Sequence, residues 1–316
     1  MMYRILYGSD LHGSNAYFRK FIAAAMQYKA NALMIGGDVT GKAMSPIIHQ
    51  GGGRYIGHLF GRKEELTTTQ ELEKFKVTVG NVGFYPIILE KDEAEVMEKD
   101  PKLLNKRFEQ EMVGRVGEWM ALFEEKLAPQ KLTLYFMPGN DDLFSIDAEI
   151  AMYPHVKNPD MTCLQLESGN ELVGLSYCNM TPWACERDIE EPQMEEKLNT
   201  LAGMIQKPET AIAMLHCPPF DSGIDVCPEL DKNIKIVTTG GQVIMKPVGS
   251  TAVRGFIEKV QPMLGLHGHI HEAPGHTHIG RTLCINAGSE YAEGIMKAAI
   301  INIEGDKVKG HLLISG

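Results

Sequence analysis

The stretch YRILYGSDLH, residues 3–12, joins a short β-rich apolar run to a polar end that carries Gly, Ser, Asp and His. Residues 15–30 follow with apolar side chains at helical spacing, and ALMIGGD, residues 32–38, then repeats the first pattern. A continuous apolar strand, a helix and a second such strand indicate a buried, partly parallel sheet.

Further apolar runs that stop at Gly, Pro or polar residues lie at 132–140, 211–219 and 263–271. Residues 163–178 and 298–314 instead have strand-like stretches on both sides of Ser-Gly-Asn and Glu-Gly-Asp, which predicts two hairpins. We therefore expect a mixed α/β fold in which two sheets pack face to face with helices outside.

Composition limits the classes of function. The chain has 316 residues, 44% of them hydrophobic, and a formal net charge of −10, which argues against nucleic acid or anionic lipid as a partner. It has no run of 18 apolar residues, and its first residues lack the pattern of a signal peptide. Its six cysteines show no CxxC pair, so we expect reduced thiols and a cytoplasmic protein without a membrane partner.

Residues 42–131 interrupt the alternation of strands and helices. The sequence therefore predicts a core made of residues 1–41 and 132–316 and an inserted, mostly helical segment at 42–131. Apolar residues three or four apart predict an amphipathic helix at 105–127 that packs on the core. Because the insertion leaves and returns at strand ends, we expect it to form a lid or side wall there.

Polar residues with metal-binding side chains end all five apolar runs of the core. They are Asp10 and His12, Asp38, Asn140, His216, and His269 with His271. Open α/β sheets build their sites at the carboxyl ends of strands. Each residue alone has an ordinary alternative, because a lone histidine is often a packed core residue and Asp after Gly is often a turn or helix cap. Five matching strand ends together favour a metal site.

The types of side chain indicate which metals the site would hold. Imidazole, carboxylate and amide donors suit Mn, Fe, Zn, Co or Ni better than a thiolate site or an all-oxygen magnesium site. In Asp-Leu-His and His-Ile-His, residues two apart on an extended segment point to one side, so each pair can approach one metal. The sequence permits two metal ions.

Five motifs in chain order, SDLHG, GGDVTG, PGNDD, LHCPP and LHGHIH, resemble the signature blocks of the calcineurin-like metallophosphoesterases and span residues 9–271. The tail INAGSEY and the hairpin after it are similar to the Icc-related phosphodiesterases. The resemblance implies a four-layer αββα sandwich of two mixed sheets with a binuclear centre of two divalent transition-metal ions. Mn is the metal we favour, with Fe, Zn, Ni and Co as alternatives.

Matched motif by motif, the resemblance also implies a ligand set for each metal. The first ion would take Asp10, His12 and His271, the second would take Asn140, His216 and His269, and Asp38 would bridge both.

One position of the third motif departs from the family pattern. Asp141 stands where the family usually has a histidine that is thought to contact the substrate phosphate and assist the leaving group. Beside two cations we expect the pKa of Asp141 to be lowered, so that it donates no proton. Asp141 is a candidate catalytic residue, and His12 is the alternative proton donor.

Other polar residues are candidates for supporting roles. We expect Asp142 to cap the short helix that follows it. Arg187, Arg254 and Arg281 are either phosphate donors or structural arginines, and Asp225 either orients a histidine ligand or caps its own loop. His49 and His58 are either surface residues or lid contacts.

The sequence thus predicts a binuclear metal-dependent phosphoesterase that hydrolyses phosphodiesters or small phosphomonoesters by attack of a hydroxide bridging the metals. Its partner would be a small phosphoester, and the sequence leaves the oligomeric state open. A metallophosphoesterase-fold scaffold without turnover and a metal-dependent nuclease are the alternatives. The acidic core and the lack of a basic, aromatic-rich groove argue against the nuclease.

Overall fold

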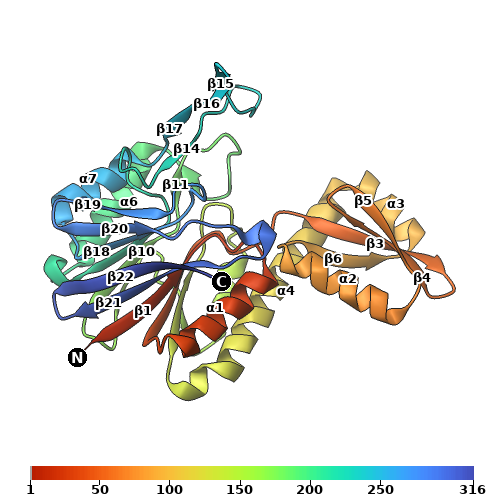
Figure 1. Ribbon diagram of the computed structural model, residues 1–316, viewed down its shortest axis with the longest axis horizontal. Coiled ribbons are helices and arrows are strands. Elements are labelled where there is room, and N and C mark those ends of the chain that lie inside the picture. Colours follow the sequence, from red (N-terminus) through yellow and green to blue (C-terminus); the bar gives the residue numbers. More distant parts are fainter. Residues whose placement is uncertain (1) are drawn as a thin grey trace.

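The computed structural model describes residues 2–316 and has two six-stranded sheets packed face to face with helices on both outer sides (Figure 1). The apolar sequence patterns explain this arrangement, because each sheet has apolar side chains on both of its faces. The predicted αββα sandwich is confirmed.

The first sheet has the strand order β22-β21-β1-β2-β7-β8. Its central strands β1, β2 and β7 run parallel, whereas β21 pairs antiparallel with β1 and with β22. The strands are β1 (Tyr3–Gly8), β2 (Ala32–Gly36), β7 (Thr133–Met137), β8 (Val156–Lys157), β21 (Lys297–Glu304) and β22 (Lys307–Ser315). The predicted hairpin at 298–314 is the β21–β22 pair.

The second sheet has the order β19-β20-β18-β13-β10-β9. Strands β10, β13, β18 and β20 run parallel, and β19 and β9 pair antiparallel at the two edges. The strands are β9 (Cys163–Gln165), β10 (Glu171–Leu175), β13 (Ile212–Leu215), β18 (Leu264–His267), β19 (Gly275–Ile279) and β20 (Thr282–Asn286). The predicted hairpin at 163–178 is the β9–β10 pair.

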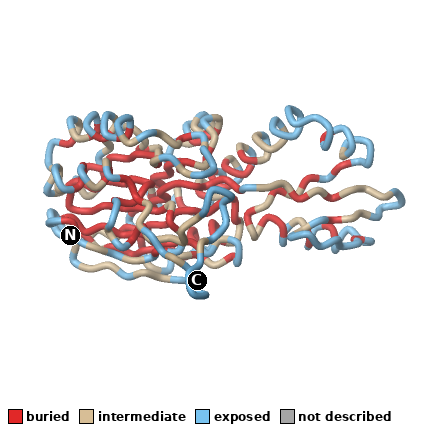
Figure 2. Tube along the Cα trace, turned by 90° about the horizontal axis from the view of Figure 1, so that it is seen from above, coloured by how far each residue is buried: buried red, intermediate tan, exposed pale blue. Residues whose placement is uncertain are grey.

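Three apolar clusters hold the four layers together. The middle one lies between the sheets and includes Tyr7, Met34 and Leu266, all fully buried. The outer face of the first sheet packs against α1 (Asn15–Gln27), α4 (Pro101–Lys126) and α5 (Ile146–Ile150), and that of the second sheet against α6 (Glu191–Met204) and α7 (Thr251–Val260). Most of the buried residues therefore lie in the sandwich (Figure 2).

Helix α1 covers most of the predicted range 15–30. The side chain of Ser14 accepts a hydrogen bond from the Tyr17 amide, which caps the helix, and Phe18, Phe21 and Ile22 are buried on the sheet. The predicted helix at 105–127 is the greater part of α4, and its Trp119 stacks on Phe18 with ring centroids 4.6 Å apart.

Residues 42–131 contain a four-stranded sheet that the sequence analysis did not predict, in addition to helices. The sheet has the order β5-β4-β3-β6. Its elements, with the two helices that pack on it, are β3 (Met44–Gly51), β4 (Arg54–Leu59), β5 (Arg62–Leu66), β6 (Tyr85–Leu89), α2 (Thr69–Asn81) and α3 (Lys91–Lys99). This sheet and its helices project away from the sandwich (Figure 1).

A second projection, residues 226–247, rises from the core at the top of the view in Figure 1, in a different direction from the insertion, and is here named the arm. It consists of two small antiparallel pairs, β14 (Val226–Pro228) with β17 (Met245–Pro247) and β15 (Thr238–Thr239) with β16 (Gln242–Val243). None of the helices formed by residues 2–316 has the length and apolar character needed to cross a bilayer.

Candidate metal centre

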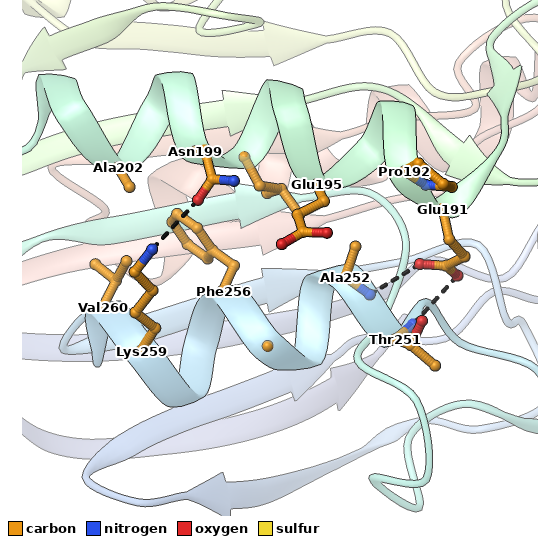
Figure 3. A pocket seen from close by; sticks show the side chains of 12 residues that line it. Glu191, Pro192, Glu195, Asn199, Ala202, Thr251, Ala252, Phe256, Lys259 and Val260 are labelled. Atoms are coloured by element: carbon orange, nitrogen blue, oxygen red, sulfur yellow. Dashed lines mark hydrogen bonds between the residues drawn. The ribbon is translucent and has the colours of Figure 1, made fainter.

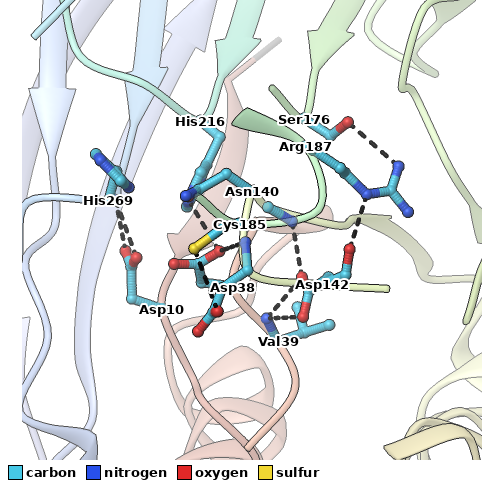
Figure 4. A network of polar contacts seen from close by, with 12 residues as sticks. Asp10, Asp38, Val39, Asn140, Asp142, Ser176, Cys185, Arg187, His216 and His269 are labelled. Atoms are coloured by element: carbon cyan, nitrogen blue, oxygen red, sulfur yellow. Dashed lines mark hydrogen bonds and ion pairs between the residues drawn. The ribbon is translucent and has the colours of Figure 1, made fainter. Parts of the chain in front are cut away.

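The loops after the parallel strands of both sheets meet at one edge of the sandwich and bring their polar side chains together (Figure 4). In the first group the ligand atoms of Asp10, His12, Asp38 and His271 all lie within 4.8 Å of one another. His12 Nε2 lies 3.1 Å from His271 Nε2, which in turn lies 3.4 Å from Asp10 Oδ1. These four residues come from the ends of β1, β2 and β18.

A second group adjoins the first. The ligand atoms of His216, His269 and Cys178 also lie within 4.8 Å of one another, and the rings of the two histidines are 5.4 Å apart. Asp38 lies between the groups, since one of its oxygens is 3.2 Å from His216 Nε2 and the other is 3.7 Å from His12 Nε2. Each group could hold a metal ion, and the carboxylate of Asp38 lies between the two.

The amide of Asn140 fits the second position. Its nitrogen donates a 2.8 Å hydrogen bond to Asp188 Oδ1, which leaves Asn140 Oδ1 buried and without a hydrogen-bond partner. A buried acceptor without a partner is costly unless a ligand satisfies it. Together with two carboxylates and four imidazoles, this oxygen makes a donor set that suits divalent transition metals.

Backbone strain marks the same residues. Asp10, His12, Asp38 and His269 have φ values of 57°, 40°, 49° and 66°, in the left-handed region that residues other than glycine rarely adopt. The expectation that residues 10–12 and 269–271 are extended is therefore wrong, because these loops turn sharply at the strand ends. His269 consequently joins His216, and His271 joins Asp10 and His12.

Gly37 leaves room for the ring of His216, one of the predicted metal ligands. It has φ 119°, and a Cβ atom at this position would clash with the ring of His216 at Nδ1. That nitrogen is 2.8 Å from the Gly36 carbonyl oxygen, and this contact turns the other ring nitrogen of His216 toward Asp38.

Charges within the site stabilise its carboxylates as anions. Burial raises the pKa of Asp10, but the hydrogen bond and charge of His271 outweigh it and lower this pKa to about 2. Burial lowers the pKa of His216, and the charge of Asp38 reverses the effect and raises it to about 10. Burial and the charge of His216 lower the pKa of His269 to about 4. His216 and Asp38 thus form a buried ion pair, with 3.2 Å between Nε2 and Oδ1, and a bound cation would compete with the proton on His216.

Asp141 lies at the rim of the site beside a lysine. Its Oδ2 is 3.2 Å from Lys42 Nζ and 3.8 Å from His12 Nδ1. Burial and the charge of Asp38 raise the pKa of Asp141, and Lys42 opposes them. The expectation of a lowered pKa applies to Asp141 beside two bound cations, and it stays a prediction.

Asp142 does not cap the helix that follows it. Its carboxylate accepts hydrogen bonds from the amides of Val39, Thr40 and Gly139 and from the Thr40 hydroxyl. The prediction of a cap is wrong because these donors, which converge from the two adjacent strand ends, enclose the side chain. Asp142 therefore fixes the loop that carries Asp38.

The arginines considered as phosphate donors are structural. Arg187 is 1% exposed and donates to the Asp142 carbonyl (Figure 4). It also donates to the Leu143 carbonyl and to Asp147, whereas Arg254 and Arg281 donate to loop carbonyls.

The two other open alternatives are also resolved. Asp225 accepts hydrogen bonds from the amides of its own loop and of Gly249, not from a histidine. His49 pairs with Glu90 on the exposed β3–β6 sheet, and the backbone carbonyl of His58 accepts a hydrogen bond from Ser45 within the insertion.

Sequence reasoning missed Cys178, Lys42, Asp188 and Tyr291. Cys178 follows β10, a strand parallel to β13, so the strand-end rule extended to β10 would have found it. Lys42 directly follows the second motif. Asp188 lies far from every motif in the sequence. The ring of Tyr291 lies 4.6 Å from that of His12, and only its place in the tail motif INAGSEY pointed to the site.

We expect Asp188→Asn to weaken metal binding. Asp188 Oδ1 accepts from Asn140 while Oδ2 accepts from the Thr181 amide and hydroxyl and the Cys185 amide. An amide has a single acceptor oxygen, so it cannot serve both sets of donors. The affinity for Mn²⁺, measured by calorimetry, should fall about 10- to 100-fold. The exposed neighbour Glu186→Gln is the control, and equal affinity in both variants would show that Asp188 does not position Asn140.

No protein-family model matches the chain, and no curated protein is similar to it in sequence. Among solved structures, TT1561 of Thermus thermophilus is 16% identical and matches with a TM-score of 0.55 over 100% of this chain and 99% of its own. Another crystal structure matches at 16% identity with a TM-score of 0.56 over the same shares. A dimetal phosphatase from Danio rerio, 8% identical over 99% of this chain and 98% of its own, has a TM-score of 0.46, which is too low to bear on function. The chain therefore has the four-layer sandwich fold that its resemblance to the calcineurin-like metallophosphoesterases implies, and it shares this fold with TT1561.

Proposed function

We propose that the protein is a metal-dependent phosphoesterase with a binuclear centre. The observation that carries the proposal is the convergence of five strand-end motifs on one site, with Asp38 between two groups of donors and a partnerless oxygen on Asn140. Two divalent ions are the cofactors that such a donor set would take, with Mn favoured and Fe, Zn, Ni and Co as alternatives.

Bound divalent ions would polarise the phosphoryl group and lower the pKa of water, which makes water a nucleophile at neutral pH. The chain itself supplies positioning around that chemistry. Lys42, at the rim, adds positive charge where a phosphate oxygen would lie, and its ion pair with Asp141 holds both side chains at the site. His12 contributes one ring nitrogen to the centre while the other faces Asp141.

We further propose phosphodiesters or small phosphomonoesters as substrates, with a preference for diesters. A carboxylate at position 141 opposes a dianionic monoester more than a monoanionic diester. The silent-scaffold alternative would be favoured by missing donors. Against it, six of the seven predicted ligand residues lie in two adjoining groups, and Asn140 lines the same cavity as Asp38 and His269. The cytoplasmic location remains a prediction from the sequence.

The experiment that tests this function is a screen of nitrophenyl phosphates and diesters after chelation and stepwise return of Mn²⁺. We expect hydrolysis that disappears with the chelator and returns with the metal. Hydrolysis that survives chelation, or none with any of the candidate metals, would contradict the proposal.

Asp141→His should make the rate less dependent on the leaving group. A histidine at this position could protonate the departing oxygen, and general acid catalysis contributes about 10²- to 10⁴-fold, so poor leaving groups should gain on the order of tenfold or more. The measurement is kcat across aryl and alkyl phosphates of increasing leaving-group pKa. Asp141→Asn, which removes the charge without adding an acid, is the control. An unchanged slope in the histidine variant would show that residue 141 does not act on the leaving group.

A further inference from the structure

A cavity of about 970 Å³ opens directly from the candidate metal centre. Asp38, Asn140, His269 and His271 are part of its lining, so a molecule bound in the cavity can reach the predicted metal ligands. A volume near 1,000 Å³ holds a drug-sized ligand, and a phosphate group would fill only a small part of it. The remainder must accommodate the group esterified to phosphorus.

The wall away from the metal end is apolar and comes from separate parts of the chain. The loop after β11 (Cys178–Asn179) contributes Met180 and Trp183, the arm contributes Ile234 and Ile236, and the segment after β13 contributes Phe220. These five are among the 18 large apolar residues that are exposed in the described part of the chain, and Trp183 is 62% exposed. Exposed apolar side chains gathered around one cavity indicate a binding surface for an apolar group.

Three polar side chains that line the cavity, Asn179, Thr181 and Glu191, are already hydrogen-bonded within the protein. Asn179 donates to the Val248 carbonyl and accepts from the Cys217 thiol, and the Thr181 hydroxyl bonds to Asp188. Glu191, which borders the cavity from α6, accepts from the amides of Thr251 and Ala252 at the start of α7 (Figure 3). A sugar or nucleobase would find few free partners on these residues, whereas an alkyl or aryl group needs none.

Two lysines line the cavity, and the one at the metal end favours a substrate whose phosphate lies there. Lys42 lies at the metal end beside Asp141, and Lys246 of the arm lies 3.4 Å from Glu229. A second hollow of about 340 Å³, between α6 and α7 (Figure 3), is lined by none of the predicted metal ligands.

We propose that the substrate is a phosphoester whose esterified group is a large apolar chain or ring, held between the arm and the loop at 180–183. This inference rests on the proposed function, because it assigns the phosphate to the metal end of the cavity. It makes the arm a specificity element that binds the apolar group.

The test measures binding of metal-loaded protein to methylphosphonate and n-hexylphosphonate by calorimetry. Each buried methylene increases affinity by up to about fourfold, so we expect hexylphosphonate to bind at least about thirtyfold more tightly. Equal affinities, no binding of either compound, or tighter binding of ribose 5-phosphate than of hexylphosphonate would each overturn the proposal.

A matched pair of variants on the arm locates the effect. Ile236→Ser removes an apolar side chain that lines the cavity, and Val243→Ser removes an exposed one on the same arm that does not. We expect only Ile236→Ser to reduce the preference for hexylphosphonate, by about three- to tenfold, with binding of methylphosphonate unchanged. A loss of equal size in both variants would contradict a direct contact.

Hydrolysis of 4-nitrophenyl methyl phosphate and 4-nitrophenyl hexyl phosphate separates this inference from the proposed function. Hexyl preference in binding without hydrolysis of either diester would leave the apolar site in place and refute the phosphoesterase. Hydrolysis of both at equal kcat/KM would support the phosphoesterase and refute the apolar site.

Discussion

Asp38→Asn should abolish nearly all hydrolysis and remove tight binding of both metal ions. Asp38 is buried between the two groups of donors, and each of its oxygens faces a different histidine. An amide has the same shape but no charge and only one good acceptor, so it cannot hold two cations. We expect activity to fall by at least about 10²- to 10³-fold, the loss typical when one major stabilising group of an active site is removed.

Metal content by mass spectrometry checks this directly, and Asp306→Asn, in the turn between β21 and β22, is the matched control. Thermal unfolding of the metal-free proteins shows whether the variant remains folded. A folded Asp38→Asn protein with the full metal content of the wild type would refute the bridging role.

The second large effect is on stability, at Arg187. This side chain is fully enclosed, donates to the Asp142 carbonyl and to Asp147, and lies over the Phe144 ring at 4.3 Å. Arg187→Met would leave buried carbonyls and Asp160 without their cation. Breaking a buried pair from one side costs about 3–5 kcal/mol, which corresponds to a fall of roughly 10 °C in Tm.

Arg107→Met is the comparison, because Arg107 forms a partly exposed pair with Glu111 on α4. The loss of such a pair should change the free energy of unfolding by less than about 1 kcal/mol. Differential scanning calorimetry measures both. If Arg187→Met unfolds like the wild type but loses affinity for phosphate, then Arg187 is a substrate donor and not a structural residue.

The sandwich was predictable because its strands are continuous apolar runs. Both faces of the first sheet are buried, so successive residues of its strands are apolar and the strands can be recognised in the sequence. One face carries Leu6, Ile35 and Phe136, and the other carries Tyr7, Met34 and Met137. The β3–β6 sheet of the insertion leaves a weaker signal, because it is small and β5 is charged and exposed in all residues but Leu66.

The site was predictable only where a donor follows a strand. Asp38 and His216 do so, whereas Asp188 reaches Asn140 from the short strand β12 (Asp188–Ile189), 48 residues further along the chain, and nothing in its local sequence indicates that contact. Asp142 shows the opposite error. Local sequence favours a helix cap, but tertiary hydrogen bonds from Val39 and Thr40 decide where the carboxylate lies.

The central claim is that the donors from five strand ends hold two adjacent metal ions. Equilibrium dialysis of the intact protein against Mn²⁺, with the bound metal counted by mass spectrometry and its coupling examined by electron paramagnetic resonance, tests it most directly. We expect two Mn²⁺ per chain, magnetically coupled to each other. No tightly bound Mn²⁺, or ions that show no coupling, would contradict a binuclear centre around Asp38.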